Sequence, residues 1–104
     1  MKIKKGDTVE VISGKDAGKQ GRVLVVDRGR ERLVIEGVNM IKRHTRPNNR
    51  NQQGGIVERE APIHVSNVMA WCDAADRPSK IIIKRLEDGS RTRAYKVNGE
   101  TLND

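Results

Sequence analysis

The chain has 104 residues, enough for one compact domain with an appendage, and its 21 Lys and Arg against 14 Asp and Glu give a net charge of +7. That charge favours polyanionic partners, because basic side chains neutralise phosphates and release counterions. One cysteine excludes an intramolecular disulfide framework, and no apolar run reaches membrane length or forms a signal peptide, so we expect a cytoplasmic protein.

Short apolar and polar alternations predict β-strands along residues 1–41. Val and Ile far outnumber Leu, and β-branched side chains favour strands over helices. Strands are expected at residues 8–12, 22–26 and 32–36, with glycine-containing turns between them. Residues 37–41 are expected to continue the sheet after a kink at the glycine. This pattern predicts an all-β fold whose first 41 residues belong to a small closed or partly closed barrel.

Residues 42–55 interrupt the strand pattern and form a predicted basic arm. No acidic residue occurs between Gly37 and Val57, and no apolar periodicity would let the segment bury itself. We expect two strands that run out to a tip and back, with the tip ordered only when bound. Arginine suits bidentate phosphate contacts, and the Asn and Gln of the tip suit sugar hydroxyls and base edges. The candidate RNA contacts of the arm are Lys42, Arg43, His44, Arg46 and Arg50.

Two alternatives stay open for this arm. A disordered, soluble loop without a binding role would have the same composition. His44 fits an exposed polar loop residue as well as a stacking or phosphate contact.

Strand signals resume after the arm. Residues 56–60 and 63–71 predict return strands that complete the barrel within residues 56–72. Residues 80–86 and 91–97 flank an Asp-Gly pair, which is a strong hairpin signal. We therefore expect a C-terminal β-hairpin extension within residues 73–104, in one structural unit with the barrel.

The glycine-rich stretch 14–21 resembles a phosphate-binding P-loop but has the wrong spacing. A P-loop has four residues between its first glycine and its Gly-Lys pair, and Ser or Thr follows that pair. Here three residues separate Gly14 from Gly18, and Gln20 follows Lys19. The turn is instead expected to present basic side chains to RNA phosphates, and the alternative is a solvated turn with ordinary lysines. The candidate RNA contacts outside the arm are Lys15, Lys19 and Arg22 of this turn and Lys2, Lys4 and Lys5 of the N-terminal segment.

No pattern in the sequence indicates catalysis, a cofactor or a small-molecule substrate. Cys72, His44 and His64 lack the spacing of a metal site, and Cys72 is expected to be an inert structural residue. His64 lies in a strand pattern and is expected to point out from the sheet. The acidic residues are dispersed, and nothing selects a catalytic pair. We expect a non-enzymatic protein without catalytic residues, metal or membrane contact.

Residues 4–23 resemble the KOW motif, with a Gly-Asp start, alternating valines and a glycine-rich turn. Residues 36–44, 54–57 and 60–68 continue a likeness that covers roughly residues 2–100. The chain is similar to the KOW-bearing family of bacterial large-subunit ribosomal proteins numbered twenty-four. The KOW motif alone also occurs in transcription elongation factors of the NusG type, so a transcription or RNA-interaction module of that kind is the alternative.

The family resemblance implies an SH3-like barrel that serves as a structural constituent of the ribosome. It implies binding to large-subunit (23S) rRNA near the 5′ domain and an early role in subunit assembly. It also implies a position by the nascent-peptide exit tunnel, with neighbouring large-subunit proteins as partners. Contact with nascent chains or tunnel-exit factors is left open.

The C-terminal region departs from part of this family. Some members have two Cys-x-x-Cys pairs that suggest a zinc ribbon. The corresponding places here hold Cys72 and Ala75, then Tyr95 and Asn98. A structural zinc needs four ligands, so the chain is expected to be metal-free. The C-terminal hairpin is then expected to be held by Ile81, Ile83, Tyr95 and Val97, with Trp71 as a neighbour.

Overall fold

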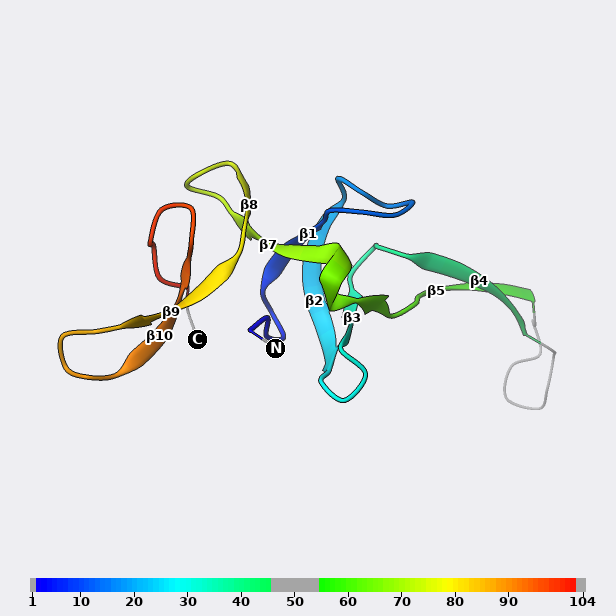
Figure 1. Cartoon of the computed structure of the whole chain (residues 1–104). Helices are drawn as coiled ribbons and strands as arrows, with labels where there is room; N and C mark the ends of the chain where they lie inside the picture. The colour runs from blue at the N-terminus through cyan, green and yellow to red at the C-terminus, as the bar shows by residue number, and fades with distance from the viewer. Residues whose placement is uncertain (1, 46–54, 103–104) are drawn as a thin grey trace.

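The computed structural model describes residues 2–45 and 55–102, except for the side chains of residues 43–45 and 55–57 (Figure 1). Within these ranges the chain is all-β, and it contains no helix long and apolar enough to cross a membrane. The elements are β1 (Thr8–Val11), β2 (Gln20–Asp27), β3 (Arg32–Ile35), β4 (Met40–Thr45), β5 (Gly55–Glu60), β6 (Ile63–His64), the 3-10 helix η1 (Val65–Asn67), β7 (Val68–Cys72), β8 (Arg77–Ser79), β9 (Ile81–Arg85) and β10 (Arg91–Tyr95).

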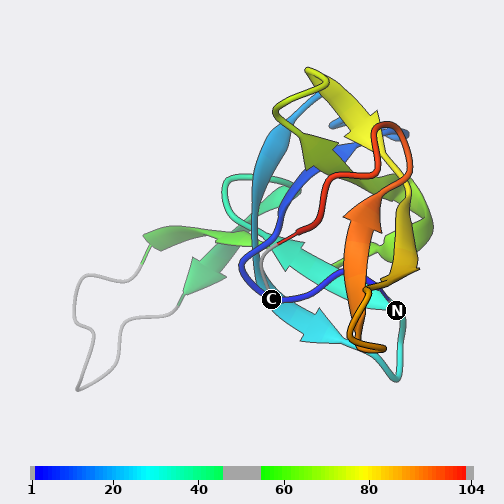
Figure 2. The same cartoon turned by 90° about the vertical axis from the view of Figure 1, so that its left-hand side faces the viewer.

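Six antiparallel strands in the order β6-β3-β2-β1-β7-β8 form the barrel. The sheet curls around one core, as the turned view in Figure 2 shows. Buried and more exposed side chains alternate along β1, β3 and β7, as period two requires when one face of a strand packs inward. The expectation of a small SH3-like barrel is confirmed. Its core contains Ile3, Val9, Val11, Val23, Leu33, Ile35, Val38, Val68, Ala70 and Ile81.

The strands of the arm pair only with each other. β4 and β5 form their own two-stranded sheet, in register from Met40 opposite Glu60 to Thr45 opposite Gly55. Residues 37–41 therefore do not continue the barrel sheet as predicted, because Gly37 and Asn39 adopt positive φ angles that turn the chain outward. The ladder likewise places residues 56–60 in the arm rather than in the barrel.

Two further elements differ from the expected strands. The predicted strand at 63–71 is divided by η1, because the His64 side chain accepts the backbone N–H of Ser66 and caps a helical turn. The short strand β8 pairs with β7 at the edge of the barrel sheet and was not predicted. It contains Pro78, which lacks a backbone N–H and is tolerated in an edge strand.

The C-terminal hairpin of β9 and β10 docks on the barrel through its proximal half. Ile81 is buried in the barrel core, and Tyr95 and Leu102 pack against that core. Val97 is half-buried, whereas Ile83 is 51% exposed and does not hold the hairpin. A buried ion pair of Arg93 with Asp7 does so instead.

Candidate nucleic-acid interface

The register of the arm places acidic residues of the return strand opposite the base of the outgoing strand. Lys42 lies directly across from Glu58, and the Lys42 Nζ and Glu58 Oε1 atoms are 4.0 Å apart. A carboxylate oxygen of Glu60 accepts the backbone N–H of Gly37. The charge at the base of the arm is therefore balanced, and the excess of positive charge in its sequence begins at Arg43.

The predicted RNA contacts beyond Lys42 are only partly covered by the structure. Arg43 and His44 lie on β4, opposite Val57 and Ile56, but their side chains are outside the described atoms. Arg46 and Arg50 lie outside the described residues altogether. The assignment of these four residues to RNA contact remains a prediction.

The glycine-rich turn fixes the base of the arm. The carboxylate of Asp16 accepts the backbone N–H of Asn39 at 2.9 Å, and it pairs with Lys19 at 2.9 Å. The Asn39 amide in turn donates to the carbonyl oxygens of Ala61 and Pro62, where the chain leaves the arm. One side chain of the turn thus connects the barrel to the start of the arm, and Asn39 connects its start to its end. Sequence analysis did not single out Asp16 or Asn39.

The contacts of Asp16 predict a pH-dependent stability. The hydrogen bond from Lys19, helped by the Asn39 N–H, lowers the pKa of Asp16 below its ordinary value of 3.8 despite partial burial. A lowered folded-state pKa stabilises the protein above pH 3.8, and this contribution disappears as the pH falls through the folded-state pKa. At pH 7 we expect Asp16→Asn to unfold at lower urea concentration than the unchanged protein. This difference between the two unfolding midpoints, the gap, should close as the pH falls. A gap that stays constant over that range would show that the charge of Asp16 does not hold the turn.

Two of the three cations predicted for this turn lie within ion-pair distance of a carboxylate. Lys19 pairs with Asp16, and an Arg22 guanidinium nitrogen lies 3.7 Å from a carboxylate oxygen of Glu36. Lys15 is exposed, with no ion pair among the described residues. Lys19 and Arg22 therefore have structural partners in addition to any contact with RNA.

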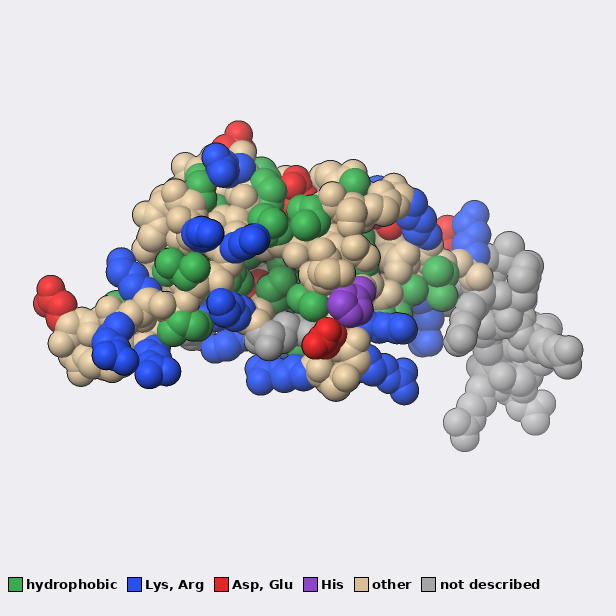
Figure 3. All heavy atoms as spheres, viewed as in Figure 1, with side chains coloured by type: hydrophobic (Ala, Val, Ile, Leu, Met, Phe, Trp, Pro, Cys, Tyr) green, Lys and Arg blue, Asp and Glu red, His purple; other side chains and the backbone are tan. Residues whose placement is uncertain are grey.

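The three N-terminal lysines belong to a larger basic surface. Lys2, Lys4 and Lys5 are exposed. They share two shallow hollows with Arg28 of the turn between β2 and β3, and one of these hollows also includes Arg91 of β10. In Figure 3, Lys and Arg side chains gather along the lower margin of the view, over the β9–β10 hairpin and the β2–β3 turn. Sequence analysis missed Arg28 and Arg91, because only the fold brings these segments together.

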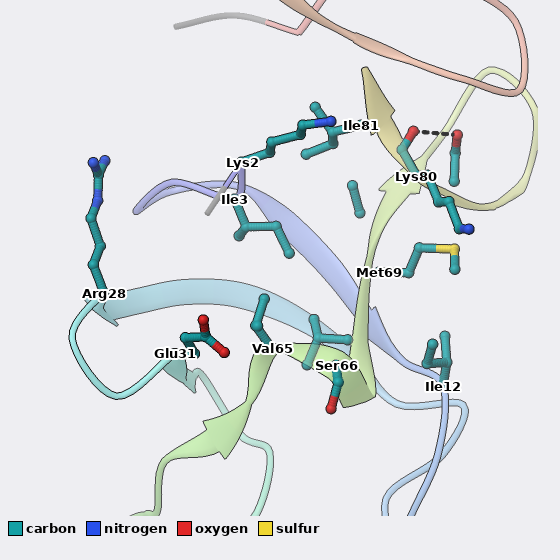
Figure 4. A pocket seen from close by; sticks show the side chains of 13 residues that line it. Lys2, Ile3, Ile12, Arg28, Glu31, Val65, Ser66, Met69, Lys80 and Ile81 are labelled. Atoms are coloured by element: carbon teal, nitrogen blue, oxygen red, sulfur yellow. Dashed lines mark hydrogen bonds between the residues drawn. The ribbon is translucent and has the colours of Figure 1, made fainter. Parts of the chain in front are cut away.

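A hollow of about 490 Å³ adjoins this basic surface. Figure 4 shows aliphatic side chains around it, among them Ile3 and Val65, with Lys2 and Arg28 at the edge. The hydroxyl of Ser66 is hydrogen-bonded to His64, and that of Ser79 donates to the carbonyl oxygen of Lys80. The same His64 ring nitrogen accepts the backbone N–H of Ser66, so this Ser–His contact belongs to the cap of η1. Within the described part of the chain, no group of three His, Cys, Asp or Glu residues is arranged to hold a metal ion.

Two of the segments where the family resemblance implied Cys pairs are in contact here, but they do not supply a zinc-binding set of ligands. The Asn98 side-chain amide donates to the Cys72 sulfur at 3.4 Å. Burial raises the pKa of Tyr95, and the nearby Cys72 adds to the effect. One thiol, an amide and a phenol do not fit the four Cys or His ligands that structural zinc requires. A hydrogen bond links these two segments of the chain instead.

Comparison with known proteins identifies the family. The model of the C-terminal domain of large ribosomal subunit protein uL24 matches residues 38–102, and the KOW motif model matches residues 5–36. The uL24 protein of Moorella thermoacetica is 55% identical over 100 residues, which cover 96% of this chain and 93% of the relative. That of Desulfosudis oleivorans is 58% identical over 93 residues (89% and 86%), and that of Coxiella burnetii is 54% identical over 102 residues (97% and 94%). The chain therefore belongs to the family of large ribosomal subunit protein uL24, a family of structural rather than enzymatic ribosomal proteins.

Proposed function

We propose that this protein binds large-subunit rRNA near its 5′ domain, supports early assembly of the subunit and lies by the nascent-peptide exit tunnel. The observation that carries this proposal is the arm. Its strands leave the barrel as a separate ladder, and every charged residue from Arg43 to its tip is basic. A hairpin that contributes nothing to the barrel core is free to contact a polyanion. The radius of gyration of 17.0 Å, against about 13 Å for a compact domain of 100 residues, agrees with an elongated molecule.

The proposed RNA contacts fall into three groups. The arm would contribute Lys42, Arg43, His44, Arg46 and Arg50. The glycine-rich turn would contribute Lys15, with Lys19 and Arg22 as paired cations beside it. The N-terminal segment would contribute Lys2, Lys4 and Lys5. The protein would act on the ribosome in the cytoplasm, with neighbouring large-subunit proteins as further partners.

A transcription module of the NusG type would rest on the KOW motif alone. The match to the uL24 C-terminal domain covers residues 38–102, outside that motif, and includes the base of the arm and the C-terminal hairpin. This second match favours the ribosomal function.

Changing Arg43 and Arg46 to Ala tests the arm. We expect weaker binding to a transcribed 5′-domain fragment of large-subunit rRNA, because two phosphate contacts would be lost. The slope of log affinity against log salt should become shallower by about 1.5–2. The urea unfolding midpoint should not change, since both residues follow Lys42 in the sequence of the arm and Arg43 lies on the separate β4–β5 ladder.

The matched control removes the same charge elsewhere. Arg77 and Lys96 are exposed and lie away from the arm, so their double change to Ala should affect binding much less. Equal binding by the arm variant and the unchanged protein would exclude the arm as an RNA-binding element.

A further inference from the structure

The C-terminal hairpin presents an unusual charge pattern on one of its faces. In the antiparallel register, Arg91 lies directly opposite Arg85, and Arg93 lies opposite Ile83. Alternation along both strands places these four side chains on the same face. Arg93 is buried against Asp7, whereas Arg85 and Arg91 lie nearer the hairpin tip and are exposed. The exposed end of this face is therefore basic.

Cations from two other segments lie across from this face. Lys2 and Lys4 of the N-terminal segment, Arg28 of the β2–β3 turn and Arg91 line a hollow of about 270 Å³ whose other lining residues are Ile83, Thr92 and Arg93. No acidic residue of the described part of the chain lines it. Among the described residues, Lys2, Arg28, Arg85 and Arg91 form no ion pair. We call this hollow, with its cations Lys2, Lys4, Arg28 and Arg91 and with Arg85 opposite Arg91 on the hairpin, the hairpin groove.

Three acidic residues of the surrounding segments have partners of their own. Asp7 is bound to Arg93, Glu31 lies 3.6 Å from His64, and Asp88 at the hairpin tip accepts two hydrogen bonds from Ser90. Like charges directly opposite each other on neighbouring strands destabilise a sheet. The Arg85 and Arg91 pair thus costs stability in the free protein, and an anion between the two guanidinium groups would reverse that cost.

We propose that the hairpin groove is a second RNA-binding site, which holds the phosphate backbone on the side of the barrel away from the arm (Figure 1). This inference rests on the proposed function and extends its N-terminal contacts Lys2 and Lys4 to a larger surface, which Arg28, Arg85 and Arg91 complete. Among the described residues, the lining of the groove includes Ile83 and Thr92 but no aromatic side chain on which an unstacked base could lie. Its contacts are therefore with phosphates and are independent of base sequence. RNA bound here and at the arm would hold the barrel from two sides.

The test compares two triple variants of the full chain. The groove variant is Lys2→Ala, Arg28→Ala and Arg91→Ala, and the matched control is Arg32→Ala, Arg77→Ala and Lys96→Ala, which removes the same charge from exposed positions outside the groove. Binding is measured against the 5′-domain rRNA fragment and an unrelated RNA of equal length over a salt series. We expect the groove variant to lose affinity for both RNAs. Its slope of log affinity against log salt should be shallower by about 2–3 than that of the unchanged protein. The control should lose clearly less.

The outcome separates this inference from the proposed function. Equal losses in the groove variant and the control would overturn the groove while leaving preference for the cognate RNA intact. If the unchanged protein shows no preference for the cognate RNA, the proposed function is contradicted. The groove would still be supported in that case if the groove variant bound RNA more weakly than the control variant.

A single charge-reversal variant tests the groove even if the triple variant does not fold. Arg91→Glu places a carboxylate opposite Arg85, so the free protein should unfold at higher urea concentration while its affinity for RNA falls. Stability and binding would then change in opposite directions, which unfolding cannot produce. Unchanged RNA affinity in this variant would overturn the proposal.

Discussion

Replacing Arg93 by Ala should lower the free energy of unfolding by about 3–5 kcal/mol, because it leaves Asp7 as a buried, unpaired charge. The two side chains are 5% and 9% exposed. Arg93 donates to both carboxylate oxygens of Asp7, one at 3.1 Å, and also to the carbonyl oxygen of Lys2 at 3.1 Å. These bonds join the C-terminal hairpin to the start of the barrel. Urea unfolding of the purified variant measures the loss.

A double variant separates the cost of an unpaired buried charge from the cost of lost packing. Asp7→Leu with Arg93→Met replaces the ion pair by apolar groups, and such replacements are often neutral. We expect it to recover much of the stability that either single change removes, although Lys4 would lose its backbone hydrogen bond to Asp7. If Arg93→Ala lowers the free energy of unfolding by less than about 1 kcal/mol, this ion pair is not the main contact that holds the hairpin on the barrel.

Replacing Gly21 by Ala should destabilise the barrel by about 1–3 kcal/mol through overpacking. A Cβ atom at this position would lie 2.6 Å from the backbone oxygen of Glu36 and 2.8 Å from a methyl carbon of Ile35. Backbone cannot move aside cheaply here, because the Glu36 N–H donates to the carbonyl oxygen of Arg22 at 2.9 Å. Ile35 is itself part of the core. Thermal and urea unfolding should both report the loss.

Gly29 provides the matched control for this change. It lies in the exposed β2–β3 turn without a left-handed φ, and an added Cβ would find only a side-chain oxygen of Asp27 at 3.7 Å. Gly29→Ala should therefore change stability by no more than about 0.5 kcal/mol. Equal effects of the two changes would show that β2 and β3 do not approach as closely at Gly21 as described.

Local patterns predicted the barrel because strand alternation is itself local. The alternation of Val9 and Val11 and of Leu33 and Ile35 follows which face of each strand packs inward. The Asp-Gly pair likewise located the C-terminal hairpin turn. The apolar residues Met40 and Ile41 favour continuation of the barrel sheet, but both are exposed in the fold and belong to the arm. Apolar residues predict strands better than they predict which sheet the strands join.

Local sequence patterns did not predict the contacts that shape the candidate interface, because these contacts join residues far apart in the sequence. Asp7 and Arg93 are 86 residues apart in the sequence, and their pairing depends on how the hairpin docks. The sequence predicts an unbalanced charge at Lys42, because no acidic residue occurs between Gly37 and Val57, yet the register brings Glu58 across from it. Arg28 and Arg91 show no pattern of their own and join the basic surface only through the fold. Charge counts predicted a polyanion partner, but not which cations lack acidic neighbours.

The most direct test of the account measures how the unchanged protein binds a transcribed 5′-domain fragment of large-subunit rRNA and an unrelated RNA of equal length as salt is raised. Salt sensitivity alone decides little, because any protein with a net charge of +7 loses affinity for RNA as counterions compete. We predict that preference for the cognate fragment persists at high salt. Equal affinity for both RNAs, lost together as the salt concentration rises, would contradict specific rRNA binding.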